Sequence, residues 1–352
     1  MNRTKIEWTE VTWNPVTGCT PVSPGCEHCY ARRMATRLRG RFGYPADNPF
    51  RVTLHEDRVE EPLRWRRPQM VFVCSMGDLF HPEVPDQFIA RVFGTMRYAL
   101  HHTFMVLTKR PERMAAWFSQ IWERPGEGYK RFGHERRPGG IEGYIVAEAD
   151  RWPLPNVWIG VTVENQEMAS KRIPILLQVP AAVRFVSAEP LLGPVDLSEW
   201  LKEVRYCEMH GQLCDEGVIW DNNGQLLCKY CKRPVERFHL LNWVIVGGET
   251  GPGARPMHPD WVRNLRDQCK DAGVTFFFKQ WGEWMPHDGC WDEPHQKIIM
   301  APDGEIREPY HGWGLDQWER GWEFMVRVGK KRAGRLLDGR AWDEMPSQVV
   351  AP

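Results

Sequence analysis

Short apolar runs recur along the chain and alternate with longer amphipathic stretches. The runs are rich in Val, Ile and Phe and almost free of charge, which is typical of strands buried on both faces of a parallel sheet. They cover residues 70–74, 103–107, 157–161, 183–186, 243–246 and 275–278. This pattern predicts six parallel strands.

The stretches between the runs are predicted to be helices. They cover residues 85–100, 111–122, 166–178 and 259–272. In the first of them Phe88, Val92 and Met96 repeat at a helical period, and Gly273 is a suitable C-cap for the last. Pro174 is expected to distort or end a turn of the third. Strand–helix alternation indicates βαβ units, so we expect an α/β fold, a partial (β/α)6 TIM-like barrel of parallel strands.

Three segments interrupt the alternation. Residues 123–151 are rich in Gly, Arg and Glu and are interpreted as a surface excursion. Residues 203–239 contain a group of cysteines and are interpreted as an insertion. After residue 282 the chain becomes rich in Trp, Gly and Asp with no clear βα repeat. The expected organisation is a barrel over residues 1–282, interrupted by the insertion, and an irregular C-terminal extension over 283–352.

The composition places few limits on function. The 352 residues contain 46 Lys and Arg and 46 Asp and Glu, so the net charge favours no nucleic acid but leaves room for a local basic patch. No apolar run reaches transmembrane length, and the polar start lacks the apolar core of a signal peptide. We therefore expect a cytoplasmic protein without membrane contact. In that compartment the 10 cysteines indicate metal ligands or buried thiols rather than disulfides.

Polar residues follow each apolar run at the point where the predicted strand ends. Because the carboxyl ends of parallel strands meet at one edge, these residues are expected to line one ligand-binding bowl. Two consecutive glycines among them would let the backbone approach a ligand closely. The candidates are Ser75, Asp78, Lys109, Arg110, Glu164, Glu189, Gly247, Gly248, Glu249 and Lys279.

Three cysteines lie upstream of the first apolar run. Cys19, Cys26 and Cys29 have the spacing C-x6-C-x2-C in a segment rich in Gly and Pro, and a predicted helix follows over 31–39. Three thiolates can hold three irons of a cubane cluster and leave the fourth iron open, whereas electron-transfer clusters usually have four protein ligands. The pattern favours a [4Fe–4S] cluster that carries out chemistry. A zinc site completed by His28 and three buried thiols are the alternatives.

The second cysteine group lies in the predicted insertion. Cys207-x2-His210 and Cys228-x2-Cys231 form two pairs typical of a zinc ribbon, and Cys214 is a fifth candidate that could replace His210. An insertion this small cannot bury enough apolar surface to fold unaided, which favours a structural zinc ion. Incidental thiols and a second iron–sulfur cluster are the alternatives.

These features carry a resemblance. The three-cysteine loop, the aromatic Tyr30 directly after it and the βα units that follow resemble the radical-SAM superfamily. The whole chain is more closely similar to an uncharacterised phage and bacterial family with a three-cysteine motif, through residues 5–9, 12–19, 107–113, 187–194, 246–258 and 277–284. The chain departs from the usual radical-SAM spacing of C-x3-C-x2-C, since its first gap is six residues long.

The resemblance implies an enzyme in which S-adenosylmethionine (SAM) chelates the open iron through its amino and carboxylate groups. An external one-electron reductant would supply the electron that cleaves SAM, and the resulting 5′-deoxyadenosyl radical would take a hydrogen atom from a substrate. The implied roles are the methionine end of SAM for Ser75 and Asp78, its ammonium or ribose for Glu164, Glu189 and Glu249, and its carboxylate or an anionic substrate for Lys109, Arg110 and Lys279.

The phage association and the supply of Arg and Trp suggest a nucleic acid or nucleotide as the substrate to be modified or repaired. A basic patch for it is sought in Arg131, Arg136 and Arg137, joined by Lys330, Lys331 and Arg332. Two other functions fit the same residues. One is a non-catalytic, metal-stabilised nucleic-acid-binding accessory protein of phages. The other is a hydrolase that uses the converging glutamates with a different metal.

Overall fold

A parallel sheet forms the centre of the molecule. The computed structural model describes residues 2–122, 152–207, 212–213, 218–221, 225–287, 295–309 and 321–347. The predicted excursion over residues 123–151, which contains Arg131, Arg136 and Arg137, lies outside the described residues. Within the described residues the main sheet has the order β1-β2-β5-β6-β7-β8-β14-β15.

Seven described strands of this sheet run parallel and curl into a half-barrel, with β1 (Asn2–Arg3) antiparallel at one edge. The six predicted strands are confirmed, and β2 is a further one that the apolar pattern did not reveal. The parallel strands are β2 (Val11–Trp13), β5 (Met70–Val73), β6 (Thr103–Thr108), β7 (Val157–Thr162), β8 (Val183–Ala188), β14 (Trp243–Gly247) and β15 (Thr275–Gln280).

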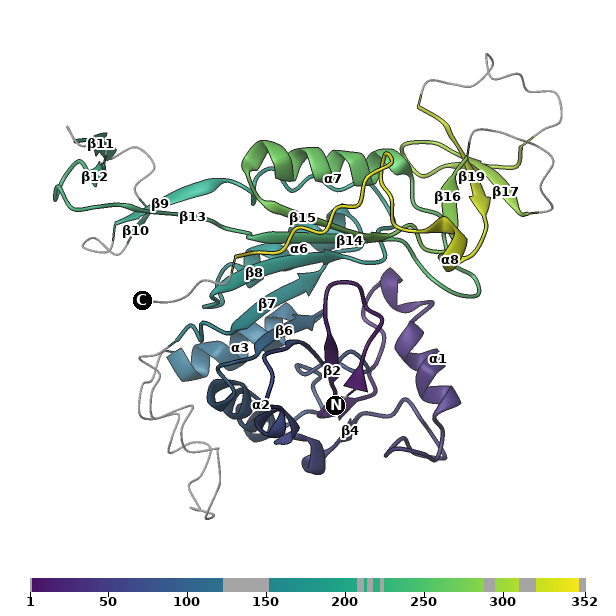
Figure 1. Ribbon diagram of the computed structural model, residues 1–352, viewed down its shortest axis with the longest axis horizontal. Helices are drawn as coiled ribbons and strands as arrows, with labels where there is room; N and C mark the ends of the chain where they lie inside the picture. The colour runs from purple at the N-terminus through teal and green to yellow at the C-terminus, as the bar shows by residue number, and fades with distance from the viewer. Residues whose placement is uncertain are drawn as a thin grey trace.

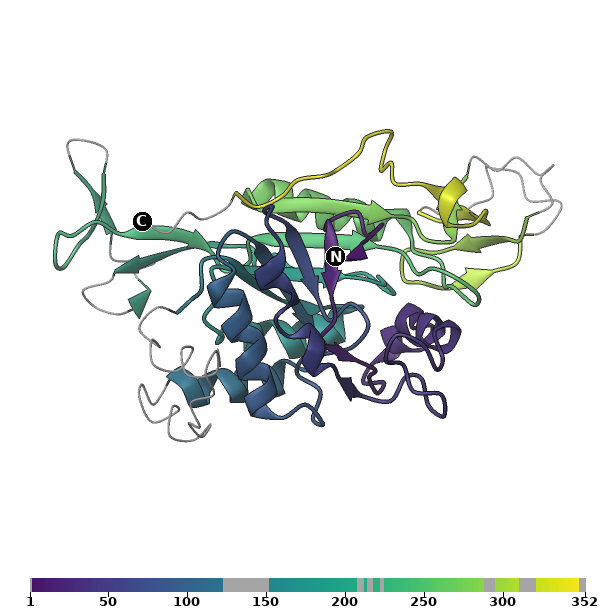
Figure 2. The same ribbon diagram turned by 60° about the horizontal axis from the view of Figure 1, so that its bottom comes forward.

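Helices follow the strands, and four of the described ones cover the outer face of the sheet (Figures 1 and 2). They are α2 (Asp86–Tyr98), α3 (Pro111–Trp122), α6 (Gln166–Leu176) and α7 (Pro259–Ala272). The helix α1 (Tyr30–Arg37) lies to one side and packs through Ala31 and Ala35 in a small cluster with Tyr44 and Met76. Gly273 ends α7 with a left-handed φ of 72°, as predicted. Pro174 lies in the last turn of α6, which ends two residues earlier than predicted. None of the described helices has the length and apolar character needed to cross a bilayer.

Short elements complete the N-terminal half of the chain. The strands β3 (Val16–Thr17) and β4 (Thr53–Leu54) pair antiparallel. Three 3₁₀ turns are present among the described residues, η1 (Pro24–Cys26), η2 (Glu56–Arg58) and η3 (Glu61–Arg64).

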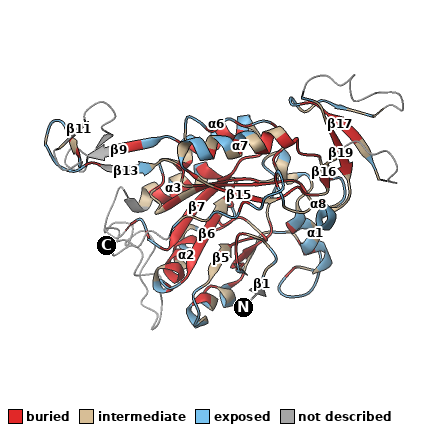
Figure 3. Cartoon of the chain, turned by 45° about the horizontal axis from the view of Figure 1, so that its top comes forward, coloured by how far each residue is buried: buried red, intermediate tan, exposed pale blue. Residues whose placement is uncertain are grey.

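Alternate residues of the strands fill two cores (Figure 3). On β6 and β14, Phe104, Val106 and Val244 pack into the large core against the helices. On the concave face, Trp158, Phe185, Trp243 and Phe277 join Trp8 and Met105 in a second cluster that is nearly free of solvent. These bulky side chains fill the concave side near the beginning of the strands.

The predicted insertion is an antiparallel arm that projects from the main body (Figure 1). The strands β9 (Glu203–Cys207), β10 (Gln212–Leu213) and β13 (Glu236–His239) form one small sheet, and β11 (Val218–Trp220) pairs with β12 (Leu226–Cys228). His210 and Cys214 lie outside the described residues, as does the side chain of Cys207. The zinc ribbon therefore stays a prediction.

The C-terminal extension contains regular structure, and the prediction of an irregular extension is wrong for its described residues. The strands β16 (Trp284–Pro286), β17 (Lys297–Met300), β18 (Ile306–Arg307) and β19 (Glu323–Arg327) form an antiparallel sheet, followed by α8 (Lys330–Ala333). The chain then returns along β15, where Asp343 pairs with Phe277 and Trp342 packs against Phe276. This return covers the edge strand of the main sheet.

Candidate active site

A cavity of about 470 Å³ opens at the carboxyl edge of the half-barrel, above the aromatic cluster of the concave face. Most of the residues singled out from the sequence border it. They are Cys19, Cys26, Cys29, Ser75, Asp78, Lys109, Arg110, Glu189, Gly248, Glu249 and Lys279. Glu164 and Gly247 do not border it. The expected convergence of strand-end residues on one bowl is thus observed for the larger part of the set.

The three cysteines reach this cavity from a loop that follows β2 and β3. Cys19 comes directly after Gly18, whose φ is 83° and where a Cβ would overlap the carbonyl oxygen of Arg51. Only glycine fits such a position, which fixes the direction in which the chain enters the loop. Cys26 ends η1, and Cys29 is the N-cap of α1. The cysteine loop therefore lies between β3, which precedes it, and α1, which follows it.

Arg110, at the end of β6, holds the first part of the loop. Its Nη1 donates to Sγ of Cys19 at 3.2 Å, and its Nη2 donates to the carbonyl oxygen of Thr20 at 2.8 Å. Asp78 fixes the guanidinium through an ion pair of 3.0 Å and also accepts from Thr108 at 2.8 Å. Burial and the negative charge of Asp78 raise the pKa of the Cys19 thiol to about 11, although Arg110 opposes this. Metal binding at Cys19 must therefore displace a proton.

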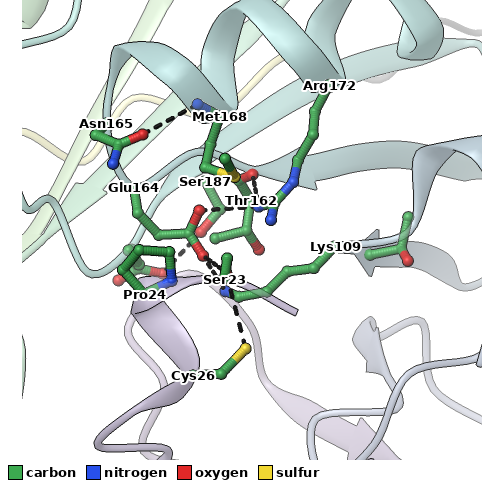
Figure 4. Close-up of polar contacts among 12 residues, drawn as sticks. Ser23, Pro24, Cys26, Lys109, Thr162, Glu164, Asn165, Met168, Arg172 and Ser187 are labelled. Carbon is green, nitrogen blue, oxygen red and sulfur yellow. Dashed lines mark hydrogen bonds and ion pairs between the residues drawn. The ribbon is translucent and has the colours of Figure 1, made fainter. Parts of the chain in front are cut away.

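Glu164, at the end of β7, holds the middle of the loop (Figure 4). It is fully buried, and one carboxylate oxygen accepts from Ser23 at 2.6 Å and pairs with Lys109 at 3.1 Å. The other oxygen pairs with Arg172 of α6 at 2.9 Å. Burial alone would raise the pKa of Glu164, but Lys109 and Arg172 outweigh it and the pKa is lowered. Glu164 thus binds the cysteine loop through Ser23 without bordering the cavity.

Arg255, in the segment after β14, holds the third part of the loop. It forms an ion pair with Glu249 at 2.6 Å, and the same Nη2 donates to the carbonyl oxygen of Pro24 at 3.0 Å. It also pairs with Glu27 at 3.1 Å. The hydrogen bonds to Glu249, which outweigh burial, raise the pKa of Arg255, so it stays charged. The carboxylate of Glu249 is thus engaged by protein.

Lys279 and Glu189 form an ion pair on the wall of the cavity. Their charged atoms are 2.9 Å apart, and Ser187 donates to the second oxygen of Glu189 at 3.1 Å. Burial would lower the pKa of Lys279, but Glu189 outweighs it and the pKa is raised, so the ammonium form is stable. Glu7 and Lys330 add a second ion pair of 3.2 Å to the lining. This wall therefore presents both signs of charge.

Gly247, the last residue of β14, and Gly248, which follows it, are glycines for a different reason from the one expected. A Cβ at Gly247 would lie 2.6 Å from Oε1 of Glu189, and one at Gly248 would overlap the carbonyl oxygen of Trp281. Protein atoms, not an open space for a ligand, exclude a side chain at both positions. Gly248 nevertheless borders the cavity.

Sequence reasoning missed several residues that hold the site together. Arg172 and Arg255 carry no local signal, because their acidic partners Glu164 and Glu249 precede them across a loop and share no helix or strand with them. Ser75, assigned to a ligand, donates to Asn14 at 3.2 Å, and its carbonyl oxygen accepts from Tyr30 at 3.1 Å. Tyr30 follows the last cysteine directly, and this position was the one available signal.

The described side chains restrict the metal chemistry. Among them no group of three or more His, Cys, Asp or Glu is placed to hold a metal ion. His28, the proposed fourth ligand of a zinc site, lies against the β14 loop, where a Cβ at Gly253 would be 2.8 Å from its ring. A cubane cluster needs wider spacing, because irons and sulfides lie between the thiolates. Cys74 is 3% exposed and belongs to the main core.

Comparison with known proteins identifies the family. The chain matches, over residues 3–346, the model of a protein family of unknown function, DUF5131, and it belongs to that family. No curated protein and no solved structure matches the chain.

Proposed function

We propose that this DUF5131 protein is a radical-SAM-type enzyme that cleaves SAM reductively at a [4Fe–4S] cluster, in order to modify or repair a nucleic acid or nucleotide. One observation carries the proposal. Cys19, Cys26 and Cys29 border a single cavity at the carboxyl edge of a curled parallel sheet, in a loop that follows β2, the first parallel strand, and the short β3. Three cysteines leave one iron of a cubane open to a non-protein ligand.

The cavity suits the cofactor pair in volume and chemistry. Ligand pockets commonly enclose about 300–1,000 Å³, and this one falls in that range. Once bound and reduced, such a cluster supplies the electron that splits SAM into methionine and a 5′-deoxyadenosyl radical, which takes a hydrogen atom from the substrate. The protein's own task is to orient both molecules and to keep water away, and the half-barrel provides the walls for this.

The Lys279–Glu189 pair is assigned to SAM. SAM carries a carboxylate, an ammonium group and ribose hydroxyls, so it needs both a cation and an acceptor at close distance. Lys279 supplies the cation and Glu189 the acceptor, and their pairing raises the pKa of Lys279 in the partly buried wall. Arg110 and Lys109 are assigned to holding the cysteine loop, because Cys19, Thr20 and Glu164 already engage them.

The arm formed by β9–β13 is assigned a structural zinc ion. Cys228 is fully buried and packs with Cys231, Leu226 and Val235 in a small cluster of their own. These four side chains are too few to stabilise the described part of the arm. A metal crosslink is therefore expected between the Cys207–His210 pair, in which Cys214 can replace His210, and the Cys228–Cys231 pair.

The proposal is tested with the full-length protein purified and reconstituted without oxygen. We expect iron and sulfide in a brown protein that releases 5′-deoxyadenosine from SAM when a low-potential reductant is added. Cys26→Ala should lose the cluster and this activity. Cys269→Ala is the matched control, because Cys269 is buried in α7 and belongs to the main core, and it should retain both.

Other outcomes would overturn the proposal. A colourless protein with zinc alone would favour the non-catalytic nucleic-acid-binding function. Hydrolytic activity that persists in air and in Cys26→Ala would favour the metal-dependent hydrolase. A cluster retained by Cys26→Ala would refute the assignment of its ligands.

A further inference from the structure

The segment directly after the cysteine loop is strongly basic. Residues 30–51 contain six arginines and one carboxylate, Asp47, in a chain whose total charge is +0. The charge in this protein is therefore unevenly distributed, and this segment is an electropositive surface. We define it as the α1 surface, formed by α1 and the loop that follows it up to Arg51.

Half of these arginines are engaged by the protein itself. Arg33 donates to the carbonyl oxygen of Thr250 at 2.7 Å, Arg51 pairs with Asp47 at 3.0 Å, and Arg32 lies over the ring of Phe50 at 5.5 Å. The contact of Arg33 fixes the α1 surface to the segment after β14, and the other two contacts lie within the α1 surface itself.

The other three arginines face solvent. Arg37, Arg39 and Arg41 are exposed, and none of them pairs with a carboxylate of the described residues. Figure 3 shows α1 as a largely exposed helix. Arg41 donates only to the carbonyl oxygen of Arg37. Unpaired guanidinium groups clustered on one surface favour a polyanionic partner.

Exposed apolar side chains lie among these cations. Phe42 is 73% exposed, Tyr30 43% and Met34 36%. Flat rings interleaved with arginines are the combination that binds single-stranded nucleic acid, because bases stack on the rings while guanidinium groups contact phosphates. An acidic protein surface would use the charges but has no bases to stack on the rings, and a lipid surface is distinguished by the vesicle measurement in the test below.

The α1 surface is continuous with the cavity. Tyr30, Ala31 and Phe50 belong to the segment and also border the cavity, beside Cys29. A strand docked on the arginines would thus pass the cavity mouth. A nucleotide extruded from such a strand would meet the mouth of the cavity that is proposed to hold the cluster and SAM.

We infer that the α1 surface docks a single-stranded nucleic acid through its phosphates and presents one of its nucleotides to the cavity. This inference rests on the proposed function, since it names the substrate of that same site as a polymer rather than a free nucleotide.

The test measures binding of a fluorescent single-stranded oligonucleotide to the full-length protein by anisotropy at several salt concentrations. The variant R37A/R39A/R41A should bind more weakly, and the slope of log K against log[salt] should fall by about 2, since each phosphate contact contributes about 0.7 for single strands. Phe42→Ala should weaken binding roughly tenfold without changing the slope.

The variant R64A/R66A/R67A is the matched control. It removes the same charge from exposed positions, but these lie just before β5, at the opposite edge of the sheet from the cavity. It should keep the wild-type slope. Equal losses in both triple variants, or none in either, would overturn the inference, as would binding to anionic phosphatidylserine vesicles but not to the oligonucleotide.

The inference and the proposed function fail in different ways. Release of 5′-deoxyadenosine from SAM without substrate reports the cluster chemistry alone, and the R37A/R39A/R41A variant should match the wild type in it. If both proteins release none, the proposed function is wrong. If both release it and oligonucleotide binding is unchanged in the variant, only the inference is wrong.

Discussion

The buried carboxylate of Glu164 provides the sharpest test of how the cysteine loop is held. We consider Glu164→Gln, which keeps the shape of the side chain and removes its charge. Arg172, whose side chain is 3% exposed, then loses its only described carboxylate partner, although it still donates to the carbonyl oxygen of Thr162 at 2.7 Å. Lys109 is 19% exposed and can turn toward the cavity.

The expected loss follows from this burial. Removing one partner of a buried ion pair costs about 3–5 kcal/mol, because the remaining charge stays out of water without compensation. For a chain of this length, roughly 2 °C per kcal/mol converts the loss into a fall of about 6–10 °C in the thermal unfolding midpoint. The measurement is scanning calorimetry of the metal-free protein at neutral pH.

The pH dependence of stability provides an independent test of the role of Glu164. The pKa of Glu164 is lowered in the folded protein, so its contribution is present above the ordinary carboxyl pKa of 4.5 and is lost as pH falls through the lowered value. The difference between Glu164→Gln and the wild type should therefore persist from neutral pH to about pH 5 and shrink below it.

Glu167→Gln serves as the control. It is the same chemical change, but Glu167 lies on the exposed face of α6, so its loss should hardly affect stability. It should shift the midpoint by less than about 1 °C. A shift for Glu164→Gln as small as that of the control, or a difference that grows in acid, would refute the reasoning.

Two further predictions concern the same edge of the sheet. Arg110→Gln removes a cationic hydrogen bond from Sγ of Cys19, so the reduction potential of the reconstituted cluster should fall, and an unchanged value in a redox titration followed by electron paramagnetic resonance would contradict this. Gly248→Ala should reduce soluble yield and the unfolding midpoint because its Cβ would overlap the backbone of Trp281, whereas Gly193→Ala, whose Cβ would have its nearest neighbour at 3.7 Å, should be tolerated.

The strands and helices of the half-barrel could be predicted because each carries its own signal. For example, β7 is buried along its whole length, and its residues 157–161 form an apolar run that no polar residue interrupts. By contrast β2 has three residues and includes Thr12, so it is too short for any periodicity to show. The strands β17 and β19 are separated by more than twenty residues of chain, and their pairing is a tertiary contact that no local pattern encodes.

The location of the site could be predicted, but the partners of its residues could not. Parallel strands bring their carboxyl ends to one edge regardless of sequence detail, which is why Lys279 and Glu189 were both expected there. Which charge pairs with which depends on distances between strands and helices. Arg172 of α6 and Arg255 after β14 complete ion pairs with Glu164 and Glu249, and neither was recognised.

These partners give a physical reason for the long gap between Cys19 and Cys26. Residues that follow three different strands each contact a different residue of this gap. Arg110 binds Thr20, Glu164 binds Ser23 and Arg255 binds Pro24. A three-residue gap could not offer all these anchoring points, so the additional residues serve to fix the loop to the sheet. The charges that do so are then unavailable to a ligand. Recognition of a ligand in the cavity must therefore depend on lining residues that do not hold the loop, such as Lys279 and Glu189.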